Sequence, residues 1–256
     1  MNQIRLLNIR IDNFSLTELL ERLNPIWGGI VLTPNVDHLM KLQNDSHFYD
    51  IYQAAQYRIC DSQILLYASK FLGTPISEKI SGSDLFPAFC QKYGADPAVK
   101  IFLLGGAPGV AQQAQQNINR RIGRELVVAA HSPSYGFEVK AGECQQILKL
   151  INQSSANVLA VGLGAPKQEK WIFKYKDSLK HIKVFLALGA ALSFEAGTLS
   201  RAPRWMSDLG LEWLHRLLRE PRRLWRRYLI DGLPFFKLIV QQKLNCYQDP
   251  FASRTL

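Results

Sequence analysis

The feature that most constrains the fold of this chain is a repeated alternation of continuous apolar runs with helix-like segments. The clearest stretch runs from residue 99 to residue 189. Its apolar runs are 99–106, 125–130, 157–164 and 182–189, and its helix-like segments are 108–121, 141–154 and 166–179. Strands that are apolar along their whole length are typical of sheets buried on both faces. The alternation therefore predicts an α/β fold, a Rossmann-like and mostly parallel sheet flanked by helices, with ligands beyond the carboxyl ends of the strands.

The first part of the chain follows the same rhythm less regularly. We predict strands at 4–11 and 29–33, an extended segment at 57–60, and helices at 15–23, after Pro34, at 46–56, at 63–72 and from near Ser83. The sequence shows no internal repeat and no low-complexity tract.

The composition changes after about residue 200. Residues 201–256 contain eleven Lys/Arg and five Asp/Glu, so this fifth of the chain carries about six of the ten formal positive charges. We predict an α/β core over 1–200 and, over 201–256, an arginine-rich helical appendage that associates with a membrane and completes the active site.

The arginines of this appendage are closely spaced. Six of them lie between Trp213 and Arg227, and Arg216, Arg219, Arg223 and Arg226 share a stripe if the segment is one helix, although Pro221 interrupts it. Guanidinium groups match phosphate oxygens in geometry. At this point the arginines fit a clamp for a diphosphate, docking to anionic lipid, contact with nucleic acid, or simply a solvated basic face.

The spacing of the cysteines and of the apolar residues indicates the cellular location of the protein. Cys60, Cys90, Cys144 and Cys246 form no CxxC pair, so they are typical of reduced thiols in a cytosolic protein and give no metal-site spacing. The N-terminus lacks a signal-peptide pattern, and no run of 18 apolar residues occurs. We expect a cytoplasmic location.

Polar residues and glycines at the predicted strand ends are the candidates for a site. Gly105 and Gly106 can bring backbone amides to a phosphate, or they form a tight turn with no ligand. Gln168 lies at the start of a helix, where it faces the strand-end crevice or is a solvated helix residue. Thr33 and Asn35 are equally compatible with helix capping. Asp61 is either an N-cap or, in a shared crevice, the best candidate for a general base.

Together these segments resemble the WecG/TagA/CpsF family of glycosyltransferases. The matching segments, in family order, are TPNVDH (33–38), Asp61, SGSDL (81–85), FLLGG (102–106), VGLGAPKQEKW (161–171), LGAALSFEAGTLSRAP (188–203) and EWLHRLLREPRRLWRRYL (212–229). The resemblance covers about residues 5 to 230.

The resemblance implies an inverting, metal-independent transfer that needs no cofactor. The donor would be a UDP-sugar of the N-acetylmannosamine type, and the acceptor a polyprenyl-diphosphate-linked N-acetylglucosamine for cell-surface polysaccharide or teichoic acid synthesis. Asp61 aligns with the proposed base, and Thr33, Asn35 and Gln168 with pocket residues. Arg216, Arg223 and Arg226 align with appendage arginines that reach the donor diphosphate. The family also implies a peripheral position on the inner face of the cell membrane and a possible homo-oligomer.

Two positions depart from the family pattern, and one rival class remains. Asp61 is followed by Ser62 where the family commonly has glycine, and Lys79 stands where an arginine is usual. The alternative is a non-catalytic Rossmann-like protein that binds a nucleotide or a lipid phosphate. A nucleic-acid partner ranks last, because the chain lacks the surface aromatic platforms of an RNA-binding sheet.

Overall fold

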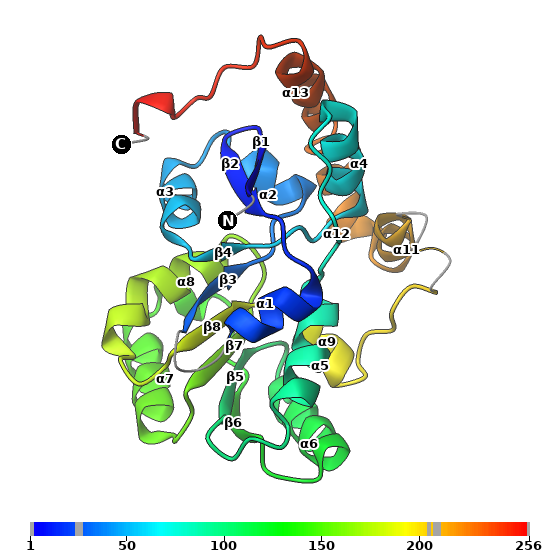
Figure 1. The fold of residues 1–256 in the computed structure, drawn as a ribbon. Helices are drawn as coiled ribbons and strands as arrows, with labels where there is room; N and C mark the ends of the chain where they lie inside the picture. Colours follow the sequence, from blue (N-terminus) through cyan, green and yellow to red (C-terminus); the bar gives the residue numbers. More distant parts are fainter. Residues whose placement is uncertain (1–2, 24–27, 204–205, 207–210, 255–256) are drawn as a thin grey trace. The chain divides into compact units, whose positions relative to one another are not determined.

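The structure, a computed structural model, describes residues 3–23, 28–203, 206 and 211–254. The contacts divide the chain into two compact units, which we describe separately (Figure 1). One unit comprises 16–32 and 82–200, and is called the sheet unit below. The other comprises 1–15, 33–81 and 201–256, and is called the hairpin unit.

The sheet unit is built on parallel strands. These are β3 (Gly29–Leu32), β5 (Ile101–Gly105), β6 (Val127–His131), β7 (Val158–Gly162) and β8 (Val184–Ala187). Every pairing among them is parallel, and their order in the sheet is β3-β8-β7-β5-β6. The short strand β4 (Tyr57–Arg58) belongs to the hairpin unit. The predicted α/β class with a mostly parallel sheet is therefore confirmed.

Two layers of helices cover this sheet (Figure 1). On one side, α1 (Leu16–Arg22), α5 (Gly82–Lys92), α6 (Val110–Ile122) and α9 (Ala191–Glu195) contact one another. On the other side lie α7 (Ala141–Gln153) and α8 (Lys167–Tyr175). All five residues of β5 are buried, as a strand that is covered on both faces requires.

The N-terminal residues of the hairpin unit differ from the sequence prediction. Residues 4–11 do not form one strand but the antiparallel hairpin of β1 (Gln3–Leu6) and β2 (Ile9–Asp12). Leu7, at the turn, has a positive φ of 53°. A non-glycine residue seldom adopts this conformation, so the apolar pattern gave no sign of the turn.

Three helices of this unit lie where the sequence predicted them, namely α2 (Val36–Lys41), α3 (Ser46–Ala54) and α4 (Gln63–Leu72). Helix α13 (Pro234–Lys243), for which no bounds were predicted, contacts both α2 and α4. Phe235 and Ile239 of α13 are buried in these contacts. The last part of the chain is therefore integrated into the hairpin unit by an apolar helix face.

The arginine-rich segment forms two helices rather than one. α11 (Glu212–Arg219) ends before Glu220, and α12 (Pro221–Leu229) begins at the proline. Proline is favoured in the first helical turn and disfavoured within a helix, which explains the break. The single stripe of four arginines is thus divided, with Arg219 on α11 and Arg226 on α12. Among the described residues, no helix is both long and apolar enough to cross a membrane.

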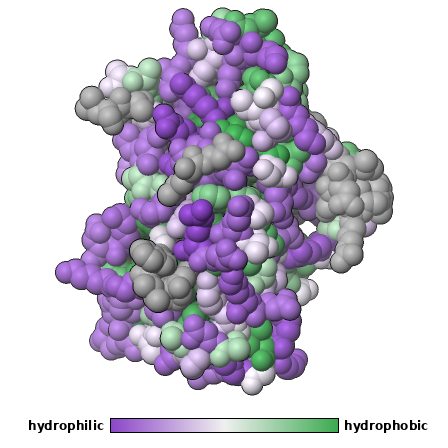
Figure 2. Space-filling model, in the orientation of Figure 1, coloured by the Kyte–Doolittle hydropathy of each residue, from purple (hydrophilic) through white to green (hydrophobic). Residues whose placement is uncertain are grey.

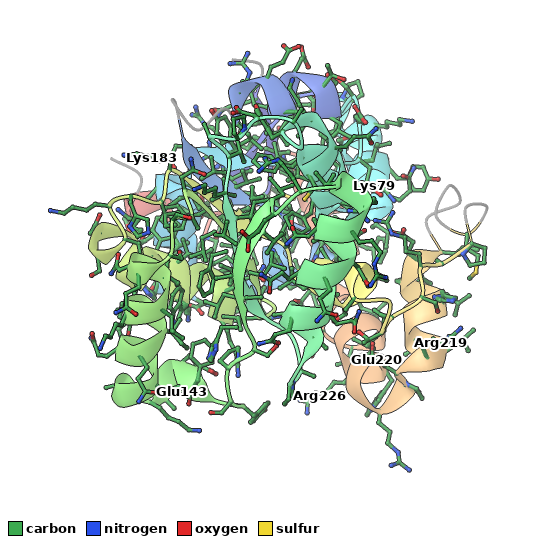
Figure 3. All side chains as sticks on the ribbon, turned by 90° about the horizontal axis from the view of Figure 1, so that it is seen from below. Lys79, Glu143, Lys183, Arg219, Glu220 and Arg226 are labelled. Carbon is green, nitrogen blue, oxygen red and sulfur yellow. The ribbon has the colours of Figure 1, made fainter. Side chains whose placement is uncertain are left out.

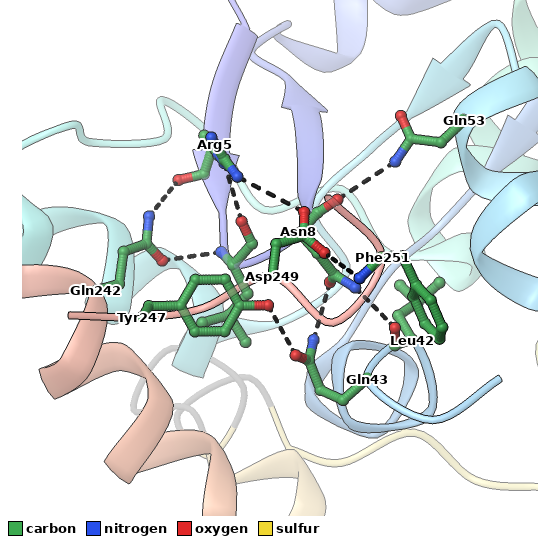
Figure 4. A network of polar contacts seen from close by, with 10 residues as sticks. Arg5, Asn8, Leu42, Gln43, Gln53, Gln242, Tyr247, Asp249 and Phe251 are labelled. Carbon is green, nitrogen blue, oxygen red and sulfur yellow. Dashed lines mark hydrogen bonds and ion pairs between the residues drawn. The ribbon is translucent and has the colours of Figure 1, made fainter. Parts of the chain in front are cut away.

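Polar contacts join the end of the chain to the N-terminal hairpin (Figure 4). The side-chain amide of Gln242 accepts a hydrogen bond from the Leu7 amide at 2.8 Å and donates to the Arg5 carbonyl at 3.0 Å. The Gln242 side chain therefore pairs with a backbone donor and a backbone acceptor of the hairpin, as a neighbouring strand would. The Tyr247 hydroxyl donates to Gln43 at 2.7 Å, and Gln43 in turn donates to the buried Asn8 at 2.8 Å.

These contacts predict that Gln242→Ala destabilises the protein. The substitution removes both bonds to the hairpin backbone, and we expect a loss of about 1–2 kcal/mol in the free energy of unfolding. Urea titration followed by circular dichroism measures it. The exposed Gln248 provides the matched control, Gln248→Ala, which we expect to change stability by less than about 0.5 kcal/mol. Equal effects of the two substitutions would contradict this assignment.

Candidate functional site

The loop after β3 contributes two of the predicted site residues to the hairpin unit. Thr33 is buried, with 4% of its surface exposed. Asn35 has an extended backbone, and its side chain accepts a hydrogen bond from the His38 amide at 3.3 Å. Asn35 is therefore the N-cap of α2, one of the two roles that the sequence left open. Capping uses one lone pair of the amide oxygen and leaves the amide nitrogen available for other contacts.

Asp61 lies beside this loop. Its backbone amide donates to the Pro34 carbonyl at 2.9 Å, and the Ile80 amide donates to the Cys60 carbonyl at 2.8 Å. The segment with Asp61 is thus held between the loop after β3 and residue 80. The Asp61 backbone therefore lies beside the loop that carries Thr33 and Asn35, and the shared site of these three residues stays a prediction.

The residue after Asp61 is the N-cap of the next helix. Ser62 holds this position at the start of α4, and its hydroxyl accepts a hydrogen bond from the Leu65 amide at 3.4 Å. The N-cap position that the sequence allowed for Asp61 is therefore that of Ser62. Asp61 is half-buried directly before this cap.

A contact that the sequence did not indicate connects this region to α11. The Lys79 ammonium lies 3.4 Å from a carboxylate oxygen of Glu212, the first residue of α11. The Lys79 side chain is 15% exposed and the Glu212 side chain 43%, so one partner of this pair is shielded from solvent and the other is open to it. In the sequence, Lys79 stood out only because the family usually has an arginine at this position. The two partners are 133 residues apart in the chain.

The predicted arginines are described to different extents. Arg226 is exposed on α12, as is Arg219 on α11 (Figure 3). The Arg226 side chain lies 4.0 Å from Asp231 in a pair that is open to solvent on both sides. The side chains of Arg216 and Arg223 lie outside the part of the chain that the structure describes, so their predicted contact with a diphosphate stays a prediction.

In the sheet unit, the predicted glycines lie where two strands end together. Gly105 pairs with Gly162 in the sheet, and a Cβ atom on Gly105 would lie 2.4 Å from the Gly162 carbonyl oxygen. The Gly106 amide donates to the same carbonyl at 3.1 Å. Both glycines thus have a structural reason to be there. An amide contact from Gly106 to a phosphate would require that hydrogen bond to break.

Gln168 is buried rather than exposed to a crevice or to solvent, with 2% of its surface accessible. Its amide oxygen accepts from the Gly164 amide at 3.2 Å and from the Gly189 amide at 3.0 Å. Its amide nitrogen donates to the buried Glu169 at 2.9 Å. Gln168 therefore joins the loop after β7 to the loop after β8, and any effect on a ligand would come through those loops.

The loop after β6 holds a polar cluster that the sequence analysis missed. Ser134 donates to Glu143 from its amide at 2.7 Å and from its hydroxyl at 2.6 Å. Lys167, at the start of α8, pairs with Glu138 and lies 5.0 Å from the centre of the Tyr135 ring. The Tyr135 side chain is almost fully exposed. Gly136, which has a positive φ, was the only local signal of a shaped loop.

The predicted residues therefore fall into two groups. Thr33, Asn35 and Asp61 lie together in the hairpin unit, which also carries α11 and α12. Gly105, Gly106 and Gln168 lie together in the sheet unit, at the carboxyl ends of β5 and β7. Within each unit the residues are close to where the order of strands and helices placed them.

We predict that Gln168→Met lowers stability strongly. Methionine has a similar volume, but it leaves the half-buried amides of Gly164 and Gly189 without the Gln168 acceptor. The expected loss is about 3 kcal/mol in the free energy of unfolding, measured by urea titration. The matched control is Gln145→Met at an exposed position of α7, where we expect less than about 0.5 kcal/mol. A Gln168→Met protein as stable as the control would show that the hydrogen bonds of Gln168 to Gly164 and Gly189 do not stabilise the fold.

The thiols give a second prediction. Burial raises the pKa of Cys60 to about 12, and burial likewise raises the pKa of Cys90 to about 12. A raised pKa keeps a thiol protonated, and therefore unreactive, at any pH well below that value. In the native protein at about pH 8, we expect a disulfide reagent to label the exposed Cys246 rapidly and the buried Cys60, Cys90 and Cys144 only after denaturation. Rapid labelling of native Cys246→Ser would contradict this.

The chain has relatives among known proteins. The chain is similar to the N-acetylglucosaminyldiphosphoundecaprenol N-acetyl-beta-D-mannosaminyltransferases of two Staphylococcus aureus strains, MRSA252 and MW2. Each is 25% identical to it over 240 residues, which cover 91% of this chain and 90% of the relative. The sequence pattern described as "Glycosyl transferase WecG/TagA/CpsF family" matches residues 4–249. The chain therefore belongs to the WecG/TagA/CpsF family of glycosyltransferases.

Proposed function

We propose that this glycosyltransferase moves a sugar of the N-acetylmannosamine type from a UDP-sugar to a polyprenyl-diphosphate-linked N-acetylglucosamine. The relatives are named for a transfer of this kind to a diphosphoundecaprenol-linked sugar. The observation that carries the proposal is Asp61, a half-buried carboxylate held beside the Thr33–Asn35 loop by the hydrogen bond from its amide to Pro34. The product would enter cell-surface polysaccharide or teichoic acid-type synthesis.

Asp61 acts in this proposal as the general base. Its carboxylate takes the proton from an acceptor hydroxyl as that oxygen attacks the anomeric carbon of the donor. The bond from the anomeric carbon to the UDP oxygen breaks in the same step, so the configuration inverts. A carboxylate within hydrogen-bond reach of a hydroxyl can act as its base, and Asp61 lies at the end of a strand, directly before the Ser62 cap of α4.

Arginine side chains stabilise the leaving group. The developing negative charge on UDP needs a cation or hydrogen-bond donors, and the sequence contains no Asp-x-Asp pair of the kind that holds a divalent metal in many sugar transferases. We assign this role to Arg216, Arg223 and Arg226, which makes the transfer independent of a metal. Thr33 and Asn35, which belong to the same unit as these arginines, would shape the donor pocket. In the sheet unit, the backbone around Gly105 and Gly106 and the loops joined by Gln168 stay candidates for a ligand contact.

The acceptor determines where the enzyme works. A polyprenyl chain stays in the bilayer, so the enzyme must meet its acceptor at the membrane surface. The net charge of residues 201–256 is positive, which favours an anionic surface. We propose that the enzyme binds peripherally to the inner face of the cell membrane through this segment, whose α11 and α12 complete the active site.

A binding protein without catalysis was the rival interpretation. Membership of a glycosyltransferase family favours the enzyme. Release of UDP from a UDP-sugar, dependent on an acceptor, distinguishes the two, and a panel of UDP-sugars tested with and without a prenyl-diphosphate-linked N-acetylglucosamine would also identify the donor. No release with any donor would favour the binding protein.

The decisive variant is Asp61→Asn. Asparagine keeps the size of the side chain but cannot accept the proton, so we expect kcat to fall at least about 100-fold with an unchanged unfolding midpoint. The control is Asp50→Asn, at an exposed aspartate of α3, which we expect to retain activity. Asp61→Asn turnover close to wild type would exclude Asp61 as the base.

A further inference from the structure

The sheet unit buries two adjacent polar side chains. Hydrophilic residues make up much of the molecular face that Figure 2 shows, as expected for side chains that prefer water. Among the described residues of the sheet unit, aromatic residues and cysteines aside, only Gln168 and Glu169 are both polar and buried. Both lie at the start of α8, and Glu169 is 0% exposed. Burying a carboxyl group costs free energy unless it is hydrogen-bonded, so the pair needs a physical explanation.

The Gln168 amide is held from two sides. Its oxygen accepts hydrogen bonds from the backbone amides of Gly164 and Gly189, and its nitrogen donates to Glu169 at 2.9 Å. If the side-chain amide turned over, its N–H groups would face the two glycine N–H groups and its oxygen would face a Glu169 oxygen. Glu169 and the two glycines therefore select the same orientation of Gln168.

The oxygen of Glu169 matters more here than the volume of its side chain. Methionine fills a similar space but offers no comparable acceptor to the Gln168 nitrogen, which lies in a side chain that is itself buried. A negative charge in the first turn of a helix also favours the helix dipole, but an exposed carboxylate would serve that purpose equally well. The burial of Glu169 is therefore better explained by its contact with Gln168.

Two kinds of glycine stand at the carboxyl ends of β7 and β8. A Cβ atom on Gly162 would lie 2.9 Å from the Gly189 carbonyl oxygen, so packing requires this glycine. Gly164 and Gly189 differ, because a Cβ atom on either would meet no heavy atom within 4 Å beyond its chain neighbours. Their φ angles are positive, 77° and 57°. Their backbone thus borders open space at the end of the sheet where α/β proteins bind ligands, and a ligand can approach it closely.

We propose that Glu169 is a positioning residue for the transfer. Glu169 holds the Gln168 amide, Gln168 fixes the loops after β7 and β8 against each other, and the donor lies against the open backbone of Gly164 and Gly189. Glu169 is fully buried, so it acts through Gln168 and does not touch the donor. The inference rests on the proposed function for the identity of the ligand, a UDP-sugar.

Amide hydrogen exchange tests the positioning without any ligand. The full chain is isotope-labelled at glycine, and NMR follows exchange of the Gly164 and Gly189 amides. Glu169→Met removes the acceptor of the Gln168 nitrogen, so we expect both glycine amides to exchange at least tenfold faster. Glu169→Gln keeps an acceptor oxygen and should exchange as the wild type does. The Gly123 amide, which bonds to backbone within α6, is the internal reference. Equal exchange in the two variants overturns the proposal.

Binding of UDP shows whether the positioned loops meet the donor. Titration calorimetry of the full chain with UDP measures the dissociation constant. We expect Glu169→Met to raise this constant at least tenfold and Glu169→Gln to keep it within about twofold of wild type. If the two glycine amides exchange faster in Glu169→Met while UDP binds as tightly as before, the loops do not hold the donor and the proposal is wrong.

Alanine substitutions keep the test decisive if Glu169→Met does not fold. Gly189→Ala places a methyl group in the open space beside the loop without a clash inside the protein, and we expect UDP to bind at least tenfold more weakly. Gly123→Ala is the matched control, because Gly123 also has a positive φ, 81°, and open space around its Cβ position, but it is the C-cap of α6. Both substitutions strain the backbone alike. Equal affinity of these two variants for UDP overturns the proposal.

This inference and the proposed function can fail separately. A wild-type protein that uses a UDP-sugar, together with a Glu169→Met variant that binds UDP equally well, would keep the proposed function and overturn the inference. A wild-type protein that neither binds UDP nor releases it from any UDP-sugar would overturn the proposed function, and with it the donor as the ligand of these loops. The exchange experiment would still decide whether Glu169 positions them.

Discussion

The positions of the loops in the sheet unit depend on where the neighbouring strands β5, β7 and β8 end. Gly105 pairs with Gly162, and the Gly106 amide bonds to the same Gly162 carbonyl, so the first two strands stop together. This approach is so close that a Cβ atom on Gly105 would collide with that carbonyl, which is why glycine stands there. Gln168 then fixes the loops after β7 and β8 against each other. The glycine-rich strand ends are first of all a packing solution, and any ligand contact must be compatible with it.

Much of this fold could be predicted because burial leaves a simple trace in the sequence. Strands covered on both faces are continuously apolar, and α4 and α7 have amphipathic patterns with clear ends, so their positions were predicted to within a residue or two. The hairpin at residues 3–12 was missed because its turn residues are Leu7 and Asn8, and it is the leucine that takes the positive φ, which a non-glycine residue seldom adopts. The division of the arginine segment depends on Pro221, which the sequence showed but could not resolve between a kink and a helix start.

The site could be predicted as a set of positions but not as a set of contacts. Asp61 follows a strand and precedes a helix, which places it at a strand end, yet only the structure shows that the adjacent Ser62 does the capping. The orientation of Gln168 depends on the Gly189 amide, 21 residues further along the chain, and the Lys79–Glu212 pair spans 133 residues. Such contacts are decided by tertiary packing, and no local pattern of residue types records them.

The helices that carry the arginines are held at both ends within the hairpin unit. Glu212, where α11 begins, pairs with Lys79, and Lys79 immediately precedes Ile80, whose amide bonds to the Cys60 carbonyl next to Asp61. After α12 the chain enters α13, whose inward face is buried and whose Gln242 completes the backbone of the N-terminal hairpin. Arg226 is therefore presented from a segment with two fixed ends. Because one of these ends leads back to Asp61, a shift of the arginine-bearing helices can reach Asp61 through short, contiguous elements of one unit.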